Sequence, residues 1–297
     1  MRLVTLALTV LTLTVNSLTL RAYDEDTDDF YWVVDEMEGP YENFDKRRSS
    51  LYFNYGQATF GAEDMAIVPA DAGLAEIQLG YTKTGYLNNA PNVAYQYYDG
   101  LTFTYLSSNL GQTAADDALG LEILRLSPTR REGLGYRLGE NRNIILFNGA
   151  SMNWNRINVL STPFDLPIDS LARASELRVY ADDIHFGMRT EAGIRAELFD
   201  QMAVETRFER SLIFRRHKFW KWAGSVVLEQ ISQELLDDFL FDALDTNPDW
   251  VPVVSFVLKN GLSYAWYEMR RTEMNWPFGD EAPLANDAFK IGLVLTL

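Results

Sequence analysis

The chain of 297 residues contains no cysteine. This absence excludes disulfides, thiolate metal ligands and a cysteine nucleophile. Histidine is nearly absent too, since only His185 and His217 occur. The sequence also contains no motif typical of a metal-ligand cluster or of a glycine-rich phosphate-binding loop. The sequence therefore predicts neither a metal site nor a cofactor.

Basic residues are scarce, with 26 Lys and Arg against 42 Asp and Glu and a net charge of −16. A surface this acidic repels phosphate backbones, which excludes nucleic acid as a partner. Long apolar runs are missing as well after residue 22, where no stretch reaches the roughly 18 residues of a transmembrane helix. If the mature chain enters a membrane, it must do so with strands.

The N-terminus carries an export signal. Arg2 precedes an apolar run from Leu3 to Leu20, so residues 1–22 are interpreted as a secretory signal peptide cleaved after Ala22. An N-terminal membrane anchor is the alternative, because the run is long enough to span a bilayer.

Residues 23–50 form an acidic segment that begins Tyr23-Asp24-Glu25-Asp26. Runs of like charge are usually solvated, which favours a periplasmic tail. The alternative is a short piece tucked inside the fold that follows.

A period of two dominates residues 184–198, where apolar and polar residues alternate, and the pattern continues from Met202 to Leu212 after a short turn. Alternation of this kind indicates strands with one apolar and one charged face. On the charged face of this hairpin we expect a lumen charge network formed by Arg189, Glu191, Arg195, Glu197, Glu205, Arg207 and Glu209. A solvated face of a soluble lipocalin-like barrel or sandwich is the alternative.

Similar patterns predict ten strands, beginning near residues 51, 74, 93, 117, 142, 184, 202, 250, 262 and 288. Two of them, Val251 to Leu258 and Leu262 to Thr272, flank Asn260-Gly261, which is typical of a hairpin turn. Short connections then fall at one end and long ones at the other, as in transmembrane barrels. The predicted fold is all-β: an antiparallel transmembrane β-barrel of about ten strands over residues 51–297.

The last nine residues, Phe289 to Leu297, are apolar at every second position counted from the end. They resemble the C-terminal assembly signal of bacterial outer-membrane β-barrel proteins, although Leu297 replaces the usual Phe or Trp. The resemblance implies a Gram-negative outer-membrane location. It also implies insertion by the barrel assembly machinery through residues 289–297 and a last strand that pairs with the first.

Residues 218–245 are unlike the rest, because apolar residues such as Leu228, Leu235 and Phe239 recur there at helical spacing. We expect an amphipathic helix on the cell surface beside the barrel rim. The basic and aromatic residues at its start suit contact with membrane lipid and lipopolysaccharide phosphates: Arg215, Arg216, Lys218, Trp220, Lys221 and Trp222. The alternative is a lid over the barrel mouth with ordinary interfacial anchoring.

The main functional hypothesis is a non-enzymatic barrel with a structural, adhesion or surface ligand-binding role, its external ligand unknown. Ten strands are too few for a wide porin channel, since open pores come with about 16. A second hypothesis is an outer-rim hydrolase that resembles the omptin family, with Asp183 and His185 as the catalytic pair and Asp116 and Asp117 as further acids. A soluble exported lipocalin-like or sandwich binding protein is the third.

Overall fold

The computed structural model describes residues 43–44, 47–61, 69–87, 90–110, 120–139, 142–161, 179–181 and 183–297. All of them belong to one compact unit, Glu42–Leu297. The predicted signal peptide, most of the acidic segment, Asp116 and Asp117 lie outside the described residues.

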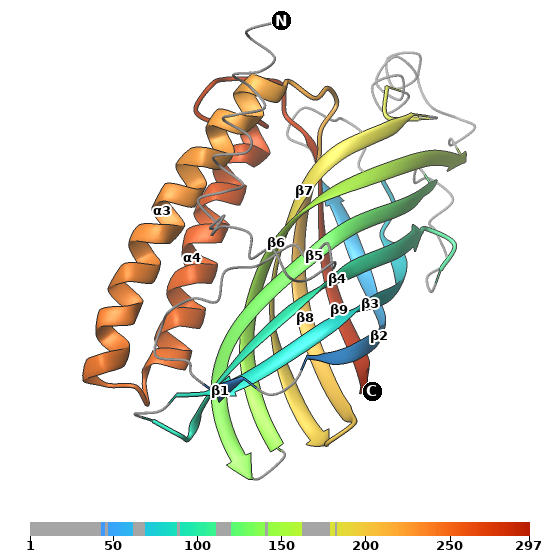
Figure 1. The fold of residues 1–297 in the computed structure, drawn as a ribbon. Helices are drawn as coiled ribbons and strands as arrows, with labels where there is room; N and C mark the ends of the chain where they lie inside the picture. Colours follow the sequence, from blue (N-terminus) through green and yellow to red (C-terminus); the bar gives the residue numbers. More distant parts are fainter. Residues whose placement is uncertain are drawn as a thin grey trace, which may run out of the picture. The chain divides into compact units, whose positions relative to one another are not determined.

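Antiparallel strands account for most of this unit (Figure 1). Their bounds are β1 (Asn43–Phe44), β2 (Arg48–Gly61), β3 (Ala72–Tyr86), β4 (Val93–Ser107), β5 (Gly120–Gly139), β6 (Arg142–Ser161), β7 (Ile184–Phe199), β8 (Met202–Ile213) and β9 (Leu284–Thr296).

Strands β2 to β9 close on themselves. Each pairs with its sequence neighbour, and β9 also pairs with β2, so that Ser50 lies opposite Thr296. In the described part of the chain the result is a closed antiparallel barrel of eight strands, with β1 paired to the end of β3. We call the end with the turn at Asp200–Gln201 the turn end, and the opposite end the loop end.

The predicted strand number of about ten is wrong. The segments expected as strands at Val251 to Leu258 and Leu262 to Thr272 form one helix, α4 (Val251–Thr272), and Asn260-Gly261 lies inside it. The pattern misled because polar residues, among them Ser255 and Lys259, are buried at helical spacing in α4. The other expected strands begin within four residues of observed ones.

A second helix, α3 (Phe219–Thr246), precedes α4, and both are inserted between β8 and β9. The two form a hairpin beside the barrel wall, where α4 packs on β5 and β6 and α3 packs on α4 (Figure 1). At the tip, Asn92 Nδ2 donates to Asp249 Oδ1 at 2.8 Å and Tyr136 OH donates to the Asp249 carbonyl at 2.8 Å. Asn92 lies at the turn end, whereas α3 begins at the loop end after β8. The hairpin therefore extends along the outside of the barrel wall from the loop end to the turn end and does not project from the loop-end rim.

Among the described residues, no helix combines the length and apolar character needed to cross a membrane.

The lumen changes character along its axis. At the loop end, inward residues of several strands form an apolar cluster that includes Leu74, Leu106, Ile123 and Ile213. Charged side chains fill the middle, where glycine provides room: a Cβ added to Gly292 would lie 1.8 Å from Asn54 Oδ1. Alternation along each strand therefore sends one set of residues into a packed interior and the other set outward.

Candidate functional site: a charged lumen inside an apolar wall

All seven residues expected in the lumen charge network lie on the inward faces of β7 and β8. Six of them are buried, and Glu197, near the turn end, is half-buried. Strand parity explains the placement, because every second residue from Arg189 to Glu197 and from Glu205 to Glu209 shares one face. These residues meet charged partners from other strands that the sequence analysis did not single out: Glu76, Arg125, Arg131 and Lys290.

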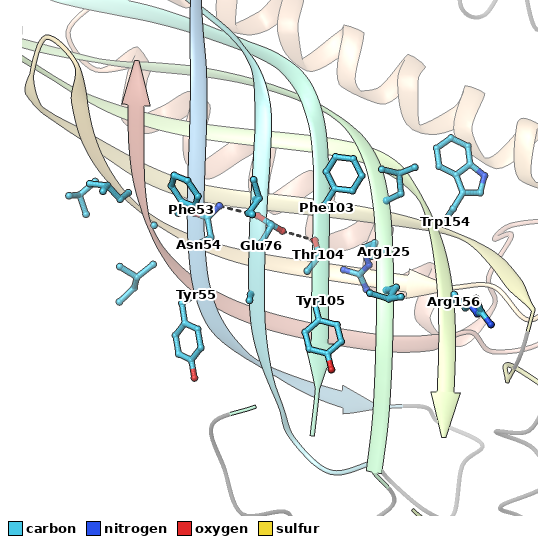
Figure 2. Close-up of a pocket in the computed structure, with 18 of the residues that line it drawn as sticks. Phe53, Asn54, Tyr55, Glu76, Phe103, Thr104, Tyr105, Arg125, Trp154 and Arg156 are labelled. Atoms are coloured by element: carbon cyan, nitrogen blue, oxygen red, sulfur yellow. Dashed lines mark hydrogen bonds between the residues drawn. The ribbon is translucent and has the colours of Figure 1, made fainter. Parts of the chain in front are cut away.

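Glu76 on β3 lies at the centre of the network. Lys290 Nζ is 2.6 Å from its Oε2, and Arg207 contacts its Oε1. Thr104 Oγ1 donates to Oε2 at 2.9 Å and Asn54 Nδ2 to Oε1 at 3.1 Å, as Figure 2 shows. One carboxylate thus joins strands that lie far apart in the sequence.

Glu209 on β8 forms the second centre. Its Oε1 lies 2.6 Å from Arg125 Nη1, and its Oε2 lies 2.5 Å from Lys290 Nζ and 3.2 Å from Arg189 Nη1. Lys290 therefore bridges Glu76 and Glu209, and the side chains of all these residues are inaccessible to solvent. Buried charges at this depth require such pairing, because removing an ion from water is costly.

A further layer lies next to these centres. Arg207 Nη1 is 3.0 Å from Glu191 Oε2, and its Nε is 3.3 Å from Glu205 Oε1. Arg131 contacts the same two carboxylates at 3.2 and 3.3 Å, and its guanidinium lies 4.4 Å from the Tyr98 ring centre. Side chains fill the cross-section here, as expected of an eight-stranded barrel.

A small polar cavity of about 240 Å³ lies at the turn end of the lumen, lined by Arg137, Asn143, Arg195 and Glu197 among others. Glu197 accepts hydrogen bonds from Gln96 Nε2 at 2.8 Å and Asn143 Nδ2 at 2.7 Å. The charged filling therefore gives way to a polar opening on this side.

The outward faces of β2 to β6 carry large apolar side chains, with Asp99 and Arg130 in register beside them. The register aligns one row of side chains around the wall, Phe53, Ile77, Phe103, Leu126 and Trp154, and a next row, Tyr55, Ala75, Tyr105, Leu124 and Arg156. Figure 2 shows Phe53, Phe103 and Trp154 from the first row and Tyr55, Tyr105 and Arg156 from the second. These rows line a shallow outer hollow of about 1090 Å³. We call this surface the apolar belt.

Tyrosines border the apolar belt on β4. Tyr97 and Tyr105 both face outward, eight residues apart. At a rise of about 3.4 Å per residue and a tilt of about 40°, this separation is about 20 Å along the barrel axis. The apolar band of bacterial outer-membrane barrels is about 25 Å tall and flanked by aromatic girdles, so the dimensions are similar.

The basic and aromatic segment at the start of α3 lies at the loop end, against the segment that precedes β9. Arg215 pairs with Glu281 at 3.4 Å, Lys218 Nζ lies 2.6 Å from Asp280 Oδ1, and Lys221 Nζ donates to the Gly279 carbonyl at 2.5 Å. Three of the four cations expected at a membrane interface are thus bound within the chain.

Arg216 and Trp220 are exposed, whereas Trp222 is buried with its Nε1 3.3 Å from Met188 Sδ. Burial alone raises the pKa of Asp280, but hydrogen bonds from Lys218, Asn275 and the Glu281 N–H outweigh it and lower the pKa below its ordinary value. Burial lowers the pKa of His217, whose ring centre lies 4.5 Å from that of Phe186.

The proposed catalytic pair is not brought together. His185 points into the lumen at the loop end, where its Nδ1 lies 3.2 Å from the Phe214 carbonyl oxygen and its ring lies beside Tyr180. Asp183 precedes β7 and is exposed, and no contact in the described part of the chain joins its carboxylate to His185. Nor do the described residues include a group of three or more His, Asp or Glu able to hold a metal. The hydrolase hypothesis stays a prediction.

No protein-family model matches the chain, and no curated protein matches it. Among solved structures, the chain is similar to Neisserial surface protein A, with 8% identity and a TM-score of 0.37 over 86% of this chain and 100% of that chain. It is also similar to Ail, the attachment invasion locus protein of Yersinia pestis, with 7% identity and a TM-score of 0.31 over 84% of this chain and 98% of that chain. Values this low carry no inference about function.

Proposed function

We propose that the chain is an integral β-barrel protein of a bacterial outer membrane. It is closed to diffusion and serves a structural, adhesion or ligand-binding role through surfaces outside the lumen. The observation that carries the proposal is the sidedness of the wall: Arg189, Arg207 and Lys290 are buried inside, while large apolar side chains are exposed outside.

The exposed apolar side chains form a continuous surface. Leu79, Tyr55, Phe289 and Ile291 each keep about half of their area exposed, at 52%, 52%, 52% and 54%. Water contact with such surface costs about 25 cal/mol per Å², whereas acyl chains remove the cost. A soluble lipocalin-like barrel or sandwich has the opposite arrangement, because its apolar residues face inward and its charges face water.

The filled lumen argues against transport. Glu76, Glu209, Arg189 and Lys290 occupy its middle and the apolar cluster closes its loop end. Opening a path would break several buried ion pairs at once, each costly to leave without a partner. Because transport through the lumen is disfavoured, we propose that the barrel acts through its external surface.

The proposed partners follow from this location. Membrane lipid covers the apolar belt, and lipopolysaccharide phosphates pair with exposed cations such as Arg156 and Arg216, each worth about 1 kcal/mol at an anionic surface. The barrel assembly machinery reads the last strand, β9, whose outward residues Phe289, Ile291, Leu293 and Leu295 keep the alternation of its C-terminal signal.

Fractionation and gel migration test the location. In a Gram-negative host, the chain should be recovered with the outer membrane and should migrate differently before and after heating in mild detergent. Recovery in the soluble periplasm would contradict the proposal.

Conductance tests the closed lumen. Purified protein in planar bilayers should give no stable open channel, because the ion pairs around Glu76 and Glu209 fill the cross-section. The matched variant is Lys290→Ala, which removes the cation that bridges both carboxylates and should produce at least transient currents. Stable channels from the unmodified protein would refute closure.

A further inference from the structure

The wall beneath the α3–α4 hairpin differs from the apolar belt. Among the charged residues at outward positions there, three lie against the hairpin: Glu132 on β5, Arg210 on β8 and Asp287 on β9. Charged side chains on the lipid face of a membrane barrel are unfavourable, most for Arg and Lys near the bilayer midplane and less for Asp and Glu. A membrane barrel with this wall therefore needs a cover over these residues.

The hairpin provides that cover through α4. Lys259 Nζ lies 2.5 Å from Glu132 Oε1, and Tyr267 OH donates to Asp287 Oδ1 at 2.8 Å. The Arg210 guanidinium lies 4.4 Å from the centre of the Tyr264 ring. Each of these three residues thus has a partner on the helix, and detaching the hairpin would expose them.

Two buried cations of the hairpin are also paired with α3. Arg270 of α4 is buried, contacts Glu229 of α3, and donates from Nε to Ser225 Oγ at 3.0 Å. Lys259 also pairs with Asp237 of α3 at 2.6 Å. Both buried cations face α3 or the wall, away from the surroundings.

The exposed side of the hairpin carries apolar residues along both helices: Leu228, Ile231, Leu235 and Phe239 on α3, and Val253, Val254, Val257 and Leu258 on α4. A surface helix in water shows the opposite pattern, with its apolar stripe toward the core. The hairpin therefore repeats the sidedness of the barrel wall.

The exposed acids of α3 lie near one border of the apolar belt. Glu234 and Asp238 flank Asp237, which is joined through Lys259 to Glu132. Glu132 pairs in register with Tyr97, the tyrosine at the turn-end border. Between Trp222 and Gln233, the part of α3 toward the loop end, the only charged residue is the paired Glu229.

We propose that the α3–α4 hairpin lies inside the bilayer beside the barrel, with lipid acyl chains against its exposed apolar face and its tip at the turn end. The hairpin depends on the wall in this arrangement, since α4 and the wall cover each other's polar residues. The inference rests on the proposed membrane location and differs from the expectation of a helix on the cell surface.

Single-cysteine variants test this placement, and the absence of native cysteine leaves no background. The reporters are Trp250→Cys at the tip, exposed and before α4, Arg216→Cys at the loop end as matched control, and Ile231→Cys on the apolar face. On intact cells, a membrane-impermeant maleimide should label Arg216→Cys. Outer-membrane barrels place their short turns in the periplasm, so the tip at the turn end should face that side. Labelling of Trp250→Cys should therefore rise severalfold only after the outer membrane is permeabilised.

A nitroxide attached to Ile231→Cys in purified outer membranes should be relaxed by oxygen and protected from a water-soluble nickel chelate, unlike one at Arg216→Cys. A further pair, Asn92→Cys with Asp249→Cys, should be joined by a short bismaleimide in the inserted, heat-modifiable protein.

Strong labelling of Trp250→Cys on intact cells would overturn the inference, as would nickel access at Ile231 equal to that at Arg216. Either result in a chain that still fractionates with the outer membrane would leave the proposed function standing. Recovery of the unmodified chain as a soluble protein would instead overturn both.

Discussion

Replacing Glu76 with glutamine should destabilise the barrel by about 3 kcal/mol. Removing one partner of a buried ion pair costs about 3 to 5 kcal/mol. The lower end of this range applies because the cations around Glu76 remain paired with other carboxylates. Lys290 and Arg189 still contact Glu209, and Arg207 still contacts Glu191 and Glu205. The introduced amide also preserves an oxygen that can accept from Asn54 or Thr104.

The assay is equilibrium unfolding in denaturant of protein folded into phospholipid vesicles, followed by tryptophan fluorescence and by gel migration. The matched control is Glu281→Gln, which breaks an exposed pair with Arg215 and should cost less than about 1 kcal/mol. Lys290→Met should also destabilise, and the double variant Glu76→Gln/Lys290→Met should lose less than the sum of both, by about 1 to 3 kcal/mol. Additive losses, or a Glu76→Gln loss no larger than that of the control, would refute the argument for a coupled buried network.

Three further predictions concern the wall, the loop end and the hairpin. Phe103→Arg, in the apolar belt, should cost about 2 to 4 kcal/mol of folding free energy, whereas Gln57→Arg, beyond Tyr55 toward the loop end, should cost about 0 to 1; equal fractions of heat-modifiable protein for both would contradict the belt. Because burial lowers the pKa of His217 in the folded chain, the unfolded chain takes up the proton first. The free energy of unfolding should therefore be highest at pH values above 6.5, the ordinary pKa of histidine, and should fall as the pH decreases through that value. The variant His217→Phe should lack this pH-dependent contribution. Superimposable pH profiles of the two proteins would contradict the prediction. Lys259→Met leaves the partly exposed Glu132 and Asp237 without their shared cation, so it should cost about 1 to 3 kcal/mol of folding free energy and increase protease cleavage near Asn247. The control Lys259→Arg should retain most of the stability. Unchanged cleavage in Lys259→Met would show that this contact does not hold the hairpin against the wall.

The sequence predicted the strands best where a wall separates two different environments. From Ile184 to Leu198 the inward residues are polar, charged or glycine and the outward ones are apolar except Thr190, so the period of two is clear. The same parity marks Glu76 and Lys290 as inward residues. Which residues meet across the lumen could not be predicted, because that depends on the register of eight strands and on closure.

Helix α4 was mistaken for a β-hairpin for a physical reason. Its buried face includes the polar residues Ser255, Lys259 and Arg270, of which Lys259 and Arg270 bind partners on α3 and the wall, whereas Val253, Val254, Val257 and Leu258 are exposed, the reverse of the usual helical pattern. Lys259-Asn260-Gly261 also has the composition of a turn, although a Cβ at Gly261 would meet nothing within 4 Å. Nothing local in the sequence indicates that the hairpin folds back along the wall, since that placement is decided by Glu132, Arg210 and Asp287 on distant strands.

The contact between Lys290 and Glu76 joins residues 214 positions apart. Lys290 belongs to β9, which arrives last during synthesis and follows the whole helical insertion. Until that strand docks, Glu76 and Glu209 share a partly formed interior without the cation that bridges them. The ion pairs that join both carboxylates through Lys290 thus form only when β9 docks, so a chain truncated before Lys290 should stall as an open, hydrated sheet that proteases can recognise, whereas barrel closure and completion of the ion-pair network occur together.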